Sequence, residues 1–246
     1  MAKAIRLDQA LVQRGLFESR NQARTAIMAG EVRIDGRVAE KPSDSVGEQH
    51  EISVAARSRY VGRGGTKLEG ALNHFAVSCE GKTALDIGAS TGGFTDCLLQ
   101  HGARKVFAVD VGQGQLAWKI RKDSRVTVLE KTNARRLSRA EIPGQIDICV
   151  IDVSFISLTL ILPNAFQLLT SGGVILALIK PQFELARAEV GRGGVVRSAE
   201  LHAKAQQKIV GFAQTLDAEV VGLVASSIAG MDGNREFFIC LRKPSA

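Results

Sequence analysis

The chain of 246 residues has few cysteines and few histidines, which argues against a metal or iron–sulfur centre. No two cysteines stand in Cys-x-x-Cys spacing, and no histidine cluster accompanies them; the four are Cys79, Cys97, Cys149 and Cys240. Metal or cluster ligation is therefore not expected. Cys97 and Cys149 fall inside a predicted helix and a predicted strand, which favours buried, reduced thiols.

The sequence also lacks the long apolar runs of exported or membrane-spanning proteins. Its N-terminus has no apolar core of the signal-peptide kind. The most apolar stretch, residues 148–162, contains Asp152 and is followed by Pro163, so it is not typical of a membrane span. We therefore expect no membrane association and a cytoplasmic location.

What the sequence does have is enough apolar content for a core and an excess of positive charge. Hydrophobic residues make up 45% of the chain, a share typical of folded globular proteins. The length allows one large domain, or a medium one with a small one. A formal net charge of +7 suggests a polyanionic partner, nucleic acid being the commonest, although charge alone leaves this open.

The first fifty-odd residues have the pattern of a small separate module. We expect helices over residues 7–14 and 19–29, and strands over 31–34, 37–39 and 51–54. Ser19 and Gln22 form a capping box at the second helix, and Gly30 supplies its stop. Asp35-Gly36 is a strong signal for a tight hairpin turn.

Several arginines of this module are spaced to share a surface. Arg20 and Arg24 are four residues apart on one helix, and Arg33 and Arg37 flank the hairpin turn. A solvated basic surface without a ligand is the simpler interpretation. Residues 1–63 carry 11 basic and 8 acidic side chains, so the excess there is modest.

Three short motifs of the module support a more specific interpretation. They are Arg6-Leu7-Asp8, Ser19-Arg20 and the run from Gly30 to Gly36. Over about residues 5–55 the chain resembles the small RNA-binding domain shared by a primary small-subunit ribosomal protein, pseudouridine synthases and tyrosyl-tRNA synthetases. The resemblance implies RNA binding.

Residues 55–65 are rich in arginine and glycine and predict a linker. We expect a small domain over residues 1–58, a linker over 59–65 and a large domain over 66–246. Because most affinity for RNA comes from phosphate contacts, the module and the linker together supply our candidate RNA-binding residues. These are Arg6, Arg20, Arg24, Arg33, Arg37, Arg59 and Arg63.

Beyond the linker, predicted helices and strands alternate. The strands span 83–87, 105–109, 126–130, 146–152, 174–179, 219–226 and 235–242; the helices span 66–75, 115–122, 158–169 and 199–214, with one more from Gly93. Such alternation is typical of an α/β fold with a mostly parallel sheet covered on both faces. The last two strands lie too close in sequence for a helix between them, so they should pair antiparallel. We expect a seven-stranded Rossmann-like sheet.

Residues 86–94, Asp-Ile-Gly-Ala-Ser-Thr-Gly-Gly-Phe, predict a strand end, a tight turn and a helix start. This is how an α/β fold brings backbone close to a nucleotide-like ligand. Ser90 stands where the dinucleotide fingerprint needs its second glycine. Asp110, at the end of the next strand, suits a ribose diol. Together these features fit S-adenosylmethionine better than a dinucleotide, although a glycine turn that only packs strand on helix remains an alternative.

The candidate cofactor residues extend around this loop. Asn133, after the third strand, is a candidate for the adenine end, and a loop-capping role is as good an interpretation. The full set is Asp86, Gly88, Ala89, Ser90, Thr91, Gly92, Gly93, Phe94, Asp110, Val111, Asn133 and Asp152.

Four charged residues are expected at the same edge of the sheet, where ligands bind in such folds. Asp152 and Lys180 end apolar strands, Glu236 opens the antiparallel last strand, and Lys67 precedes the first strand on a helix. Converging lysines and carboxylates can hold one lysine neutral, which makes it a candidate general base. Surface ion pairs are the alternative.

Two missing motifs argue against a nitrogen or a carbon atom as the methyl acceptor. The Asn/Asp-Pro-Pro-Tyr/Phe motif of exocyclic-amine methylases is replaced by Asp152-Val153-Ser154-Phe155. Carbon methylation of pyrimidines needs a thiolate nucleophile, and no cysteine follows a proline near the site. An oxygen acceptor such as a ribose hydroxyl remains.

The loop at residues 86–94 is similar to the cofactor loop of FtsJ-type ribose 2′-O-methyltransferases. The ordered set Lys67, Asp152, Lys180 and Glu236 matches their Lys-Asp-Lys-Glu tetrad. With the N-terminal module, and with close matches at residues 62–68, 152–158 and 179–184, the whole chain resembles the hemolysin A (TlyA) family. One departure is Ser90-Thr91, where FtsJ-type loops favour Ala-Pro.

This resemblance implies S-adenosylmethionine as cofactor and 2′-O-methylation of cytidine in ribosomal RNA of assembled particles. It implies that Lys180 removes the proton of the hydroxyl, that Asp152 orients it, that Lys67 holds the acceptor and that Glu236 fixes the lysines. Two other classes compete. A membrane-lysing protein lacks support in the absence of a spanning or lytic helix. A non-catalytic ribosome-binding factor would not need the tetrad.

Overall fold

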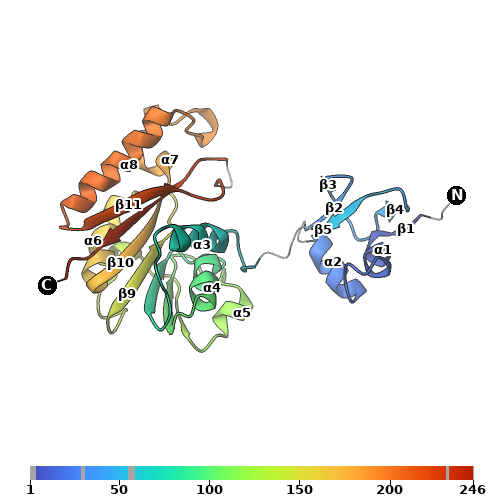
Figure 1. Ribbon diagram of the computed structural model, residues 1–246, viewed down its shortest axis with the longest axis horizontal. Coiled ribbons are helices and arrows are strands. Elements are labelled where there is room, and N and C mark those ends of the chain that lie inside the picture. The colour runs from blue at the N-terminus through green and yellow to red at the C-terminus, as the bar shows by residue number, and fades with distance from the viewer. Residues whose placement is uncertain (1–3, 29–30, 55–58, 231–232, 246) are drawn as a thin grey trace. The chain divides into compact units, whose positions relative to one another are not determined.

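The computed structural model describes residues 4–28, 31–54, 59–230 and 233–245. The chain divides into two compact units, Met1–Arg59 and Tyr60–Ala246, each drawn in Figure 1 with its element labels. Two predicted features, the helix stop at Gly30 and the domain boundary at residue 58, lie outside the described residues.

Over its described residues, the small unit is an α/β module with two helices and two small antiparallel sheets. Its elements are β1 (Ile5–Arg6), α1 (Leu7–Gln13), α2 (Arg20–Met28), β2 (Val32–Ile34), β3 (Arg37–Val38), β4 (Ser45–Val46) and β5 (Ile52–Val54). Ser19 Oγ accepts a hydrogen bond from Gln22 N at 3.3 Å, as the capping motif predicts. Asp35 and Gly36 have φ of 49° and 80°, the left-handed pair that a tight hairpin turn requires.

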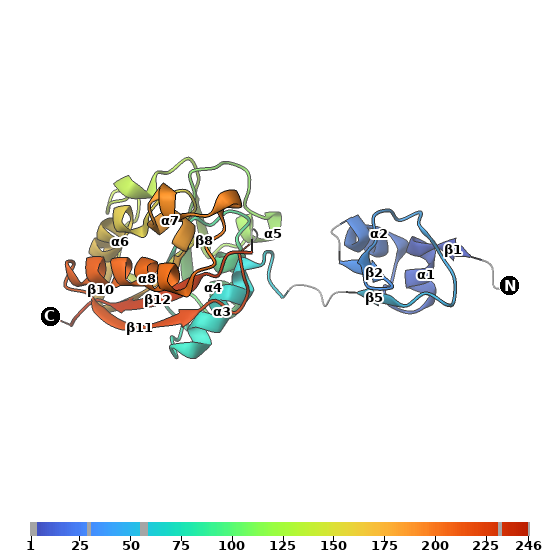
Figure 2. The same ribbon diagram turned by 90° about the horizontal axis from the view of Figure 1, so that it is seen from above.

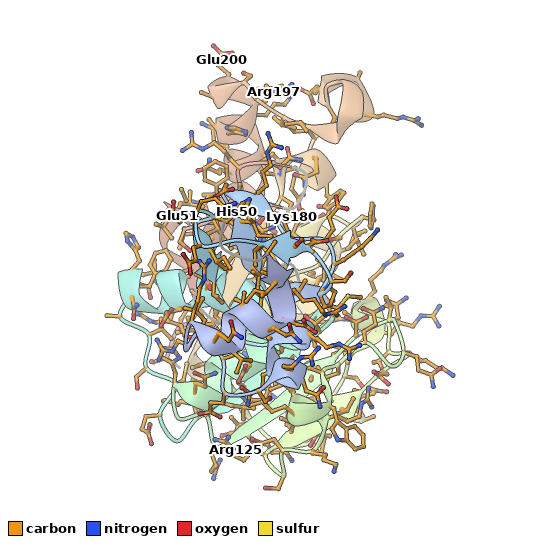
Figure 3. The ribbon with its side chains drawn as sticks, turned by 90° about the vertical axis from the view of Figure 1, so that its right-hand side faces the viewer. His50, Glu51, Arg125, Lys180, Arg197 and Glu200 are labelled. Carbon is orange, nitrogen blue, oxygen red and sulfur yellow. The ribbon has the colours of Figure 1, made fainter. Side chains whose placement is uncertain are left out.

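The pairing of β1 with β4 was not predicted from the sequence. These strands have two residues each, too few to show an alternating pattern. They close a core in which Leu7, Leu11 and Ile27 are buried. Figure 3 marks His50 and Glu51 in the turn that precedes β5.

The large unit is a seven-stranded sheet in the order β11-β12-β10-β9-β6-β7-β8. Its strands are β6 (Thr83–Ile87), β7 (Lys105–Val109), β8 (Val126–Leu129), β9 (Ile146–Ile151), β10 (Leu169–Ile179), β11 (Glu219–Ala225) and β12 (Phe237–Arg242). Strand β12 pairs antiparallel with both β10 and β11, and the pairs from β10 to β8 are parallel. The predicted fold, with an antiparallel last strand, is confirmed.

Helices cover both faces of this sheet (Figures 1 and 2). They are α3 (Gly64–His74), α4 (Gly93–Gln100), α5 (Trp118–Arg121), α6 (Leu162–Leu168), α7 (Pro181–Glu184) and α8 (Ala199–Gln214), with 3-10 turns at Ala134–Arg136, Leu158–Leu160, Arg187–Glu189 and Arg192–Gly194. Successive strand residues point to opposite faces. Thus Ala84 packs with α3 and α4, and Leu85 packs with α6 and α8.

Some predicted boundaries differ from the structure. The helix expected over residues 158–169 is a 3-10 turn followed by α6, because Pro163 lacks an N–H and is tolerated only in the first helical turn. Helix α5 is a single turn rather than residues 115–122. Strand β12 begins at Phe237, so Glu236 lies just before the strand and not in it.

The strand order places a topological switch at β6. Strand β6 pairs with β7 on one side and with β9 on the other. Connections therefore leave the carboxyl ends of neighbouring strands in opposite directions, and a crevice opens between them. The predicted cofactor loop follows β6 at this point.

Candidate active site

The loop after β6 bends tightly through three left-handed residues. Gly88, Ser90 and Gly92 have φ of 87°, 47° and 95°. A Cβ on Gly88 would meet Asp152 O at 2.3 Å, so only glycine fits there. The remaining backbone then runs into the N-terminus of α4, which is buried against α3.

Asp110 holds the loop in place with its carboxylate. Its Oδ2 accepts a hydrogen bond from Ser90 N at 2.8 Å, and its Oδ1 accepts one from Gly112 N at 2.7 Å. Carboxylate oxygens have lone pairs for further donors. Asp110 therefore orders the loop and can still accept a further hydrogen bond from a ligand hydroxyl.

Asp86 lies in the core beneath the loop and lines neither of the two cavities described below. It is fully buried, and its Oδ2 accepts a hydrogen bond from Thr95 Oγ1 at 2.6 Å. Its Oδ1 has no hydrogen-bond partner in the part of the chain that the structure describes. Burial raises the pKa of Asp86 to about 7, the Thr95 hydrogen bond opposes this rise, and the charge of Asp152 adds to it.

Two adjoining cavities meet at the carboxyl ends of the strands. One, of about 510 Å³, is lined by Lys67, Ala89, Thr91, Gly93, Phe94, Lys180 and Glu236 among others. The second, of about 610 Å³, is lined by Asp110, Val111, Asn133 and their neighbours. Both share Gly88, Ser90, Asp152, Ser154 and Phe155. Of the predicted cofactor residues, Asp86 and Gly92 line neither cavity.

The four charged residues of the predicted tetrad form two ion pairs in the first cavity. Lys180 Nζ lies 2.7 Å from Asp152 Oδ1, and Lys67 Nζ lies 2.6 Å from Glu236 Oε2. The Lys67 and Glu236 side chains are only 10% and 4% exposed, so this pair is not an ordinary surface ion pair. Figure 3 marks Lys180 in the large unit.

Asn133 has the capping role that the sequence left open as an alternative. Its Oδ1 accepts a hydrogen bond from Arg135 N at 3.0 Å and caps the 3-10 turn that follows. Asn133 also lines the second cavity beside Val111, which is 72% exposed. Asn133 thus caps the turn and borders the cavity at the same time, so the capping role does not exclude contact with a ligand there.

Sequence reasoning missed seven residues that line the first cavity: Gly64, Ser154, Phe155, Gln182, Phe183, Gly230 and Asn234. Phe155 is 90% exposed, has φ of 64° and lies 5.0 Å from the Phe183 ring centroid. An exposed aromatic residue in a left-handed conformation is unusual outside functional sites. For Ser154 and Phe155, the motif Asp152-Val153-Ser154-Phe155 was the available signal. It places these two side chains shortly after Asp152, the carboxylate that follows β9.

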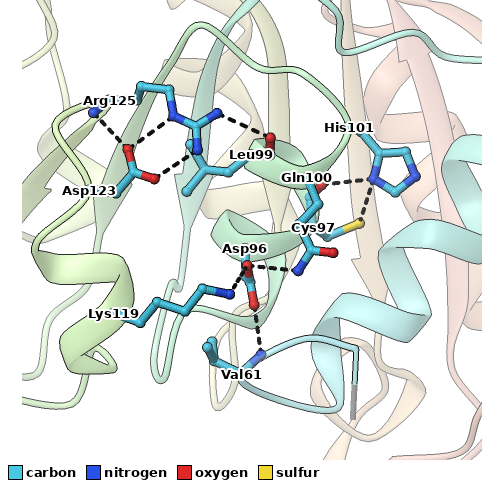
Figure 4. Close-up of polar contacts among 9 residues, drawn as sticks. All are labelled: Val61, Asp96, Cys97, Leu99, Gln100, His101, Lys119, Asp123 and Arg125. Atoms are coloured by element: carbon cyan, nitrogen blue, oxygen red, sulfur yellow. Dashed lines mark hydrogen bonds and ion pairs between the residues drawn. The ribbon is translucent and has the colours of Figure 1, made fainter. Parts of the chain in front are cut away.

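The predicted linker is attached to the large unit from Tyr60 onward. Tyr60 is 2% exposed within the core beneath α3 and α4. Val61 N donates to Asp96 Oδ2 at 2.9 Å, a contact drawn in Figure 4. Arg63 Nη2 donates to Ala229 O at 3.0 Å, and Arg63 lines the first cavity. Residues 60–65 thus group with the large unit, whereas the sequence pattern set residues 59–65 apart as a linker.

In the small unit, two of the predicted RNA-binding arginines converge on one buried carboxylate. Arg6 Nε lies 3.0 Å from Asp8 Oδ1, and Arg20 Nη2 lies 2.9 Å from Asp8 Oδ2. The hydrogen bond from Arg6 is the main reason why the pKa of Asp8 is lowered to about 2. Asp8 therefore fixes both guanidinium groups while leaving each about half exposed.

The other predicted RNA-binding arginines are exposed. Arg24 and Arg37 have exposed side chains, and Arg59 is the exposed last residue of the small unit. Arg33 Nη1 donates to Gly36 O at 3.0 Å across the hairpin turn. Arg24, Arg33 and Arg37 can therefore reach phosphate groups without breaking a buried contact.

The four cysteines are buried. Within the described residues, there is no group of three or more His, Cys, Asp or Glu side chains that could hold a metal ion. In the same residues, every helix is too short or too polar to cross a membrane.

Comparison with known proteins finds a family match for each of the two units. Residues 60–243 match the family described as FtsJ-like methyltransferase, and residues 5–52 match the S4 domain. The chain is 47% identical over 244 residues to the 16S/23S rRNA (cytidine-2'-O)-methyltransferase TlyA of Mycobacterium tuberculosis, covering 98% of this chain and 91% of that protein. It is 41% identical to Hemolysin A of Brachyspira hyodysenteriae over 95% of this chain and 98% of that one.

A solved structure described as "Putative hemolysin from Streptococcus thermophilus" superimposes with a TM-score of 0.77 at 43% identity. The match covers 100% of this chain and 90% of that one.

Proposed function

The chain belongs to the FtsJ-like, S-adenosylmethionine-dependent methyltransferases with an N-terminal S4 domain, the TlyA family, and we propose that it methylates a cytidine 2′-hydroxyl in ribosomal RNA. The observation that carries this proposal is that two ion pairs lie beside the loop after β6: Lys180 with Asp152, and Lys67 with Glu236. The substrate named for the tuberculosis relative supports ribosomal RNA as the acceptor.

The cofactor fits the second cavity and the loop. Asp110 would offer its carboxylate to the ribose diol, Val111 and Asn133 would contact the adenine end, and the backbone from Gly88 to Phe94 would hold the methionine end. When bound, S-adenosylmethionine supplies a methyl group on a sulfonium, which is electrophilic. Asp152 lines both cavities, so it stands where cofactor and acceptor would meet.

Lys180 is our candidate for the general base. A ribose hydroxyl is a poor nucleophile until it loses its proton, and neutral Lys180 can accept that proton. Asp152, 2.7 Å away, orients the amine and favours the ammonium that forms. Two reactants held side by side need no further ordering, which lowers the barrier.

Lys67 and Glu236 form the second ion pair of the first cavity, and we assign it to binding the acceptor nucleotide. Glu236 is paired with Lys67 and holds that ammonium at a fixed place. Lys67 is then positioned for the ribose or a phosphate of the acceptor nucleotide. The nearly complete burial of the pair keeps this interaction strong, because solvent does not screen it.

The small unit supplies affinity for RNA in this proposal. Arg6 and Arg20, oriented by Asp8, and the exposed Arg24 and Arg37 would contact phosphates. Binding should then weaken steeply with salt. An enzyme that acts on ribosomal particles works in the cytoplasm, which we propose as its compartment.

The proposal is tested with ribosomal particles from cells that lack the protein. Purified protein and isotopically labelled S-adenosylmethionine are added to small and large particles separately, and methylated nucleotides are mapped by mass spectrometry. We expect 2′-O-methylcytidine in ribosomal RNA. Label on a base, or particle binding without label, would overturn the proposal; the second result would favour a non-catalytic binding factor.

A further inference from the structure

Lys180 has a second partner besides Asp152. Its Nζ donates to Ser154 Oγ at 2.9 Å, while Asp152 Oδ1 lies at 2.7 Å. Ser154 is exposed and lines both cavities, so it stands at the entrance and not in the core. Nothing in the packing of the sheet requires a hydroxyl there.

The number of partners matters because a neutral amine has two N–H bonds and one lone pair. Ser154 Oγ accepts one N–H of Lys180. The Asp152 carboxylate, whose Oδ1 lies 2.7 Å from Nζ as an ion-pair partner without an aligned hydrogen bond, attracts the second N–H and repels the lone pair. Lys180 Nζ has no third partner among the residues that the structure describes. The remaining tetrahedral direction is then the lone pair. With one acceptor alone, the amine could rotate about its Cε–Nζ bond and point the lone pair elsewhere.

We propose that Ser154 is a positioning residue that, with Asp152, aims the lone pair of neutral Lys180 at the acceptor hydroxyl. This inference rests on the proposed function. In the step itself, the O–H bond of the acceptor breaks, its proton forms the third N–H bond of Lys180, and the oxygen keeps the electron pair with which it attacks. Ser154 neither gains nor loses a proton.

The loop that carries Ser154 is fixed at both ends. Asp152 N donates to Ile87 O at 2.9 Å, and Leu158 N donates to Glu184 Oε1 at 2.8 Å. Between them, Phe155 takes a left-handed conformation with φ of 64°, which a phenylalanine rarely adopts without constraint. Ser154 is thus held in place by its backbone, as an orienting group must be.

The test compares Ser154→Ala, Ser154→Thr and a matched control, Ser124→Ala, at an exposed serine in the turn before β8. Because Ser154 is exposed, its variants should fold, and thermal unfolding verifies this. We measure single-turnover methylation of particles, KM for particles and the Kd for S-adenosylmethionine by calorimetry.

We expect Ser154→Ala to lower the single-turnover rate by roughly 10–10²-fold. KM and Kd should be nearly unchanged, because the variant loses only the orientation of the Lys180 lone pair. Ser154→Thr keeps a hydroxyl and should recover the rate to within a few-fold of wild type. Ser124→Ala should match wild type. A lost rate that the threonine variant does not recover, or a wild-type rate in Ser154→Ala, overturns the inference.

Lys180→Ala distinguishes this result from a failure of the proposed function. If Lys180→Ala is inactive while Ser154→Ala is fully active, only the role of Ser154 is wrong. If wild type transfers no methyl group, or if Lys180→Ala keeps its rate, the proposed function or its base is wrong instead.

Discussion

At the scale of single residues, the proposed chemistry depends on a lysine that can be both neutral and charged. We predict that Lys180→Arg loses roughly 10²–10⁴-fold in methylation rate, because arginine keeps its proton at accessible pH. The arginine can still pair with Asp152, so charge is retained and only proton acceptance is lost. Single-turnover assays at saturating cofactor measure the effect, and calorimetry should show little change in cofactor affinity. A rate within a few-fold of wild type would show that the residue supplies charge only.

A second residue-scale prediction concerns the buried carboxyl of Asp86. Burial raises its pKa to about 7, well above the value of an unfolded chain. The folded state therefore binds a proton more tightly, and the stability that this contributes is fully present below about pH 4 and lost as pH rises toward 7. Asp86→Asn does not ionise and escapes this loss.

The melting temperature of Asp86→Asn, relative to wild type, should therefore rise by several degrees between pH 5 and pH 8. Differential scanning calorimetry of the large unit's transition checks this. Asp217→Asn, at an exposed turn with φ of 55°, is the control and should show no such trend. A constant difference between Asp86→Asn and wild type would contradict a buried, titrating carboxyl.

The sequence identified the charged residues of the site more readily than their arrangement. Lys67, Asp152 and Lys180 could be found because they follow apolar strands or match a known tetrad in order. Which lysine pairs with which carboxylate depends on side chains from elements far apart in sequence, as in Lys67 and Glu236. Ser154 is marked only by its place in the motif after Asp152, since an exposed serine after a strand is by itself ordinary in sequence.

At the scale of elements, the buried carboxylate of Glu184 connects the loop that carries Asp152 with the segment that follows Lys180. Glu184 Oε1 accepts from Leu158 N at 2.8 Å, and its Oε2 accepts from Ser157 Oγ at 2.5 Å and lies 3.1 Å from Lys208 Nζ of α8. The loop after β9 carries Asp152, and α7 directly follows Lys180. Glu184 thus fixes one loop against the other.

We predict that Glu184→Ala destabilises the large unit by roughly 1–3 kcal/mol, because Leu158 N loses its buried acceptor. The methylation rate should fall as well, since the two loops shift relative to each other. Urea unfolding and single-turnover assays measure both effects. Lys204→Ala, at another lysine of α8, breaks a surface ion pair with Glu189 of the 3-10 turn Arg187–Glu189 and should cost less than about 1 kcal/mol. Equal effects of the two variants would contradict a special role for Glu184.

Element boundaries were predictable where the local pattern is strong. The bounds of β6, β7 and α8 match those expected, because clear apolar periodicity and a cap such as Ser198 mark them. Helix α5 is shorter than expected, because Leu116 and Ala117 contact the loop after β6 instead of forming a helical turn. Ala117 N donates to Thr91 O of that loop at 3.0 Å. Such tertiary contacts carry no signal in local sequence.

At the scale of the whole molecule, the two units have separate cores and separate proposed tasks. The small unit packs around Leu7, Leu11 and Ile27, and the large unit packs on both faces of its sheet. This separation predicts that removing the small unit spares cofactor binding. The start of the shortened chain matters, because Tyr60 belongs to the core of the large unit.

We therefore predict different results for two shortened chains. A chain that begins at Arg59 keeps Tyr60 in its buried place and the bond from Val61 N to Asp96, shown in Figure 4. It should bind S-adenosylmethionine within a few-fold of the full chain and yet fail to methylate ribosomal particles. A chain that begins at Thr66 loses the buried aromatic ring, a loss that costs roughly 3–5 kcal/mol for large residues in cores.

Calorimetry, thermal unfolding and particle methylation separate the outcomes. The chain from Thr66 should melt well below the chain from Arg59 and bind the cofactor more weakly, because α4 begins at the cofactor loop and packs against Tyr60. Equal melting temperatures would show that Tyr60–Gly65 contributes nothing to the large unit. Full methylation by the chain from Arg59 would show that the large unit recognises the particle by itself, and the division between an RNA-binding unit and a catalytic unit would be wrong.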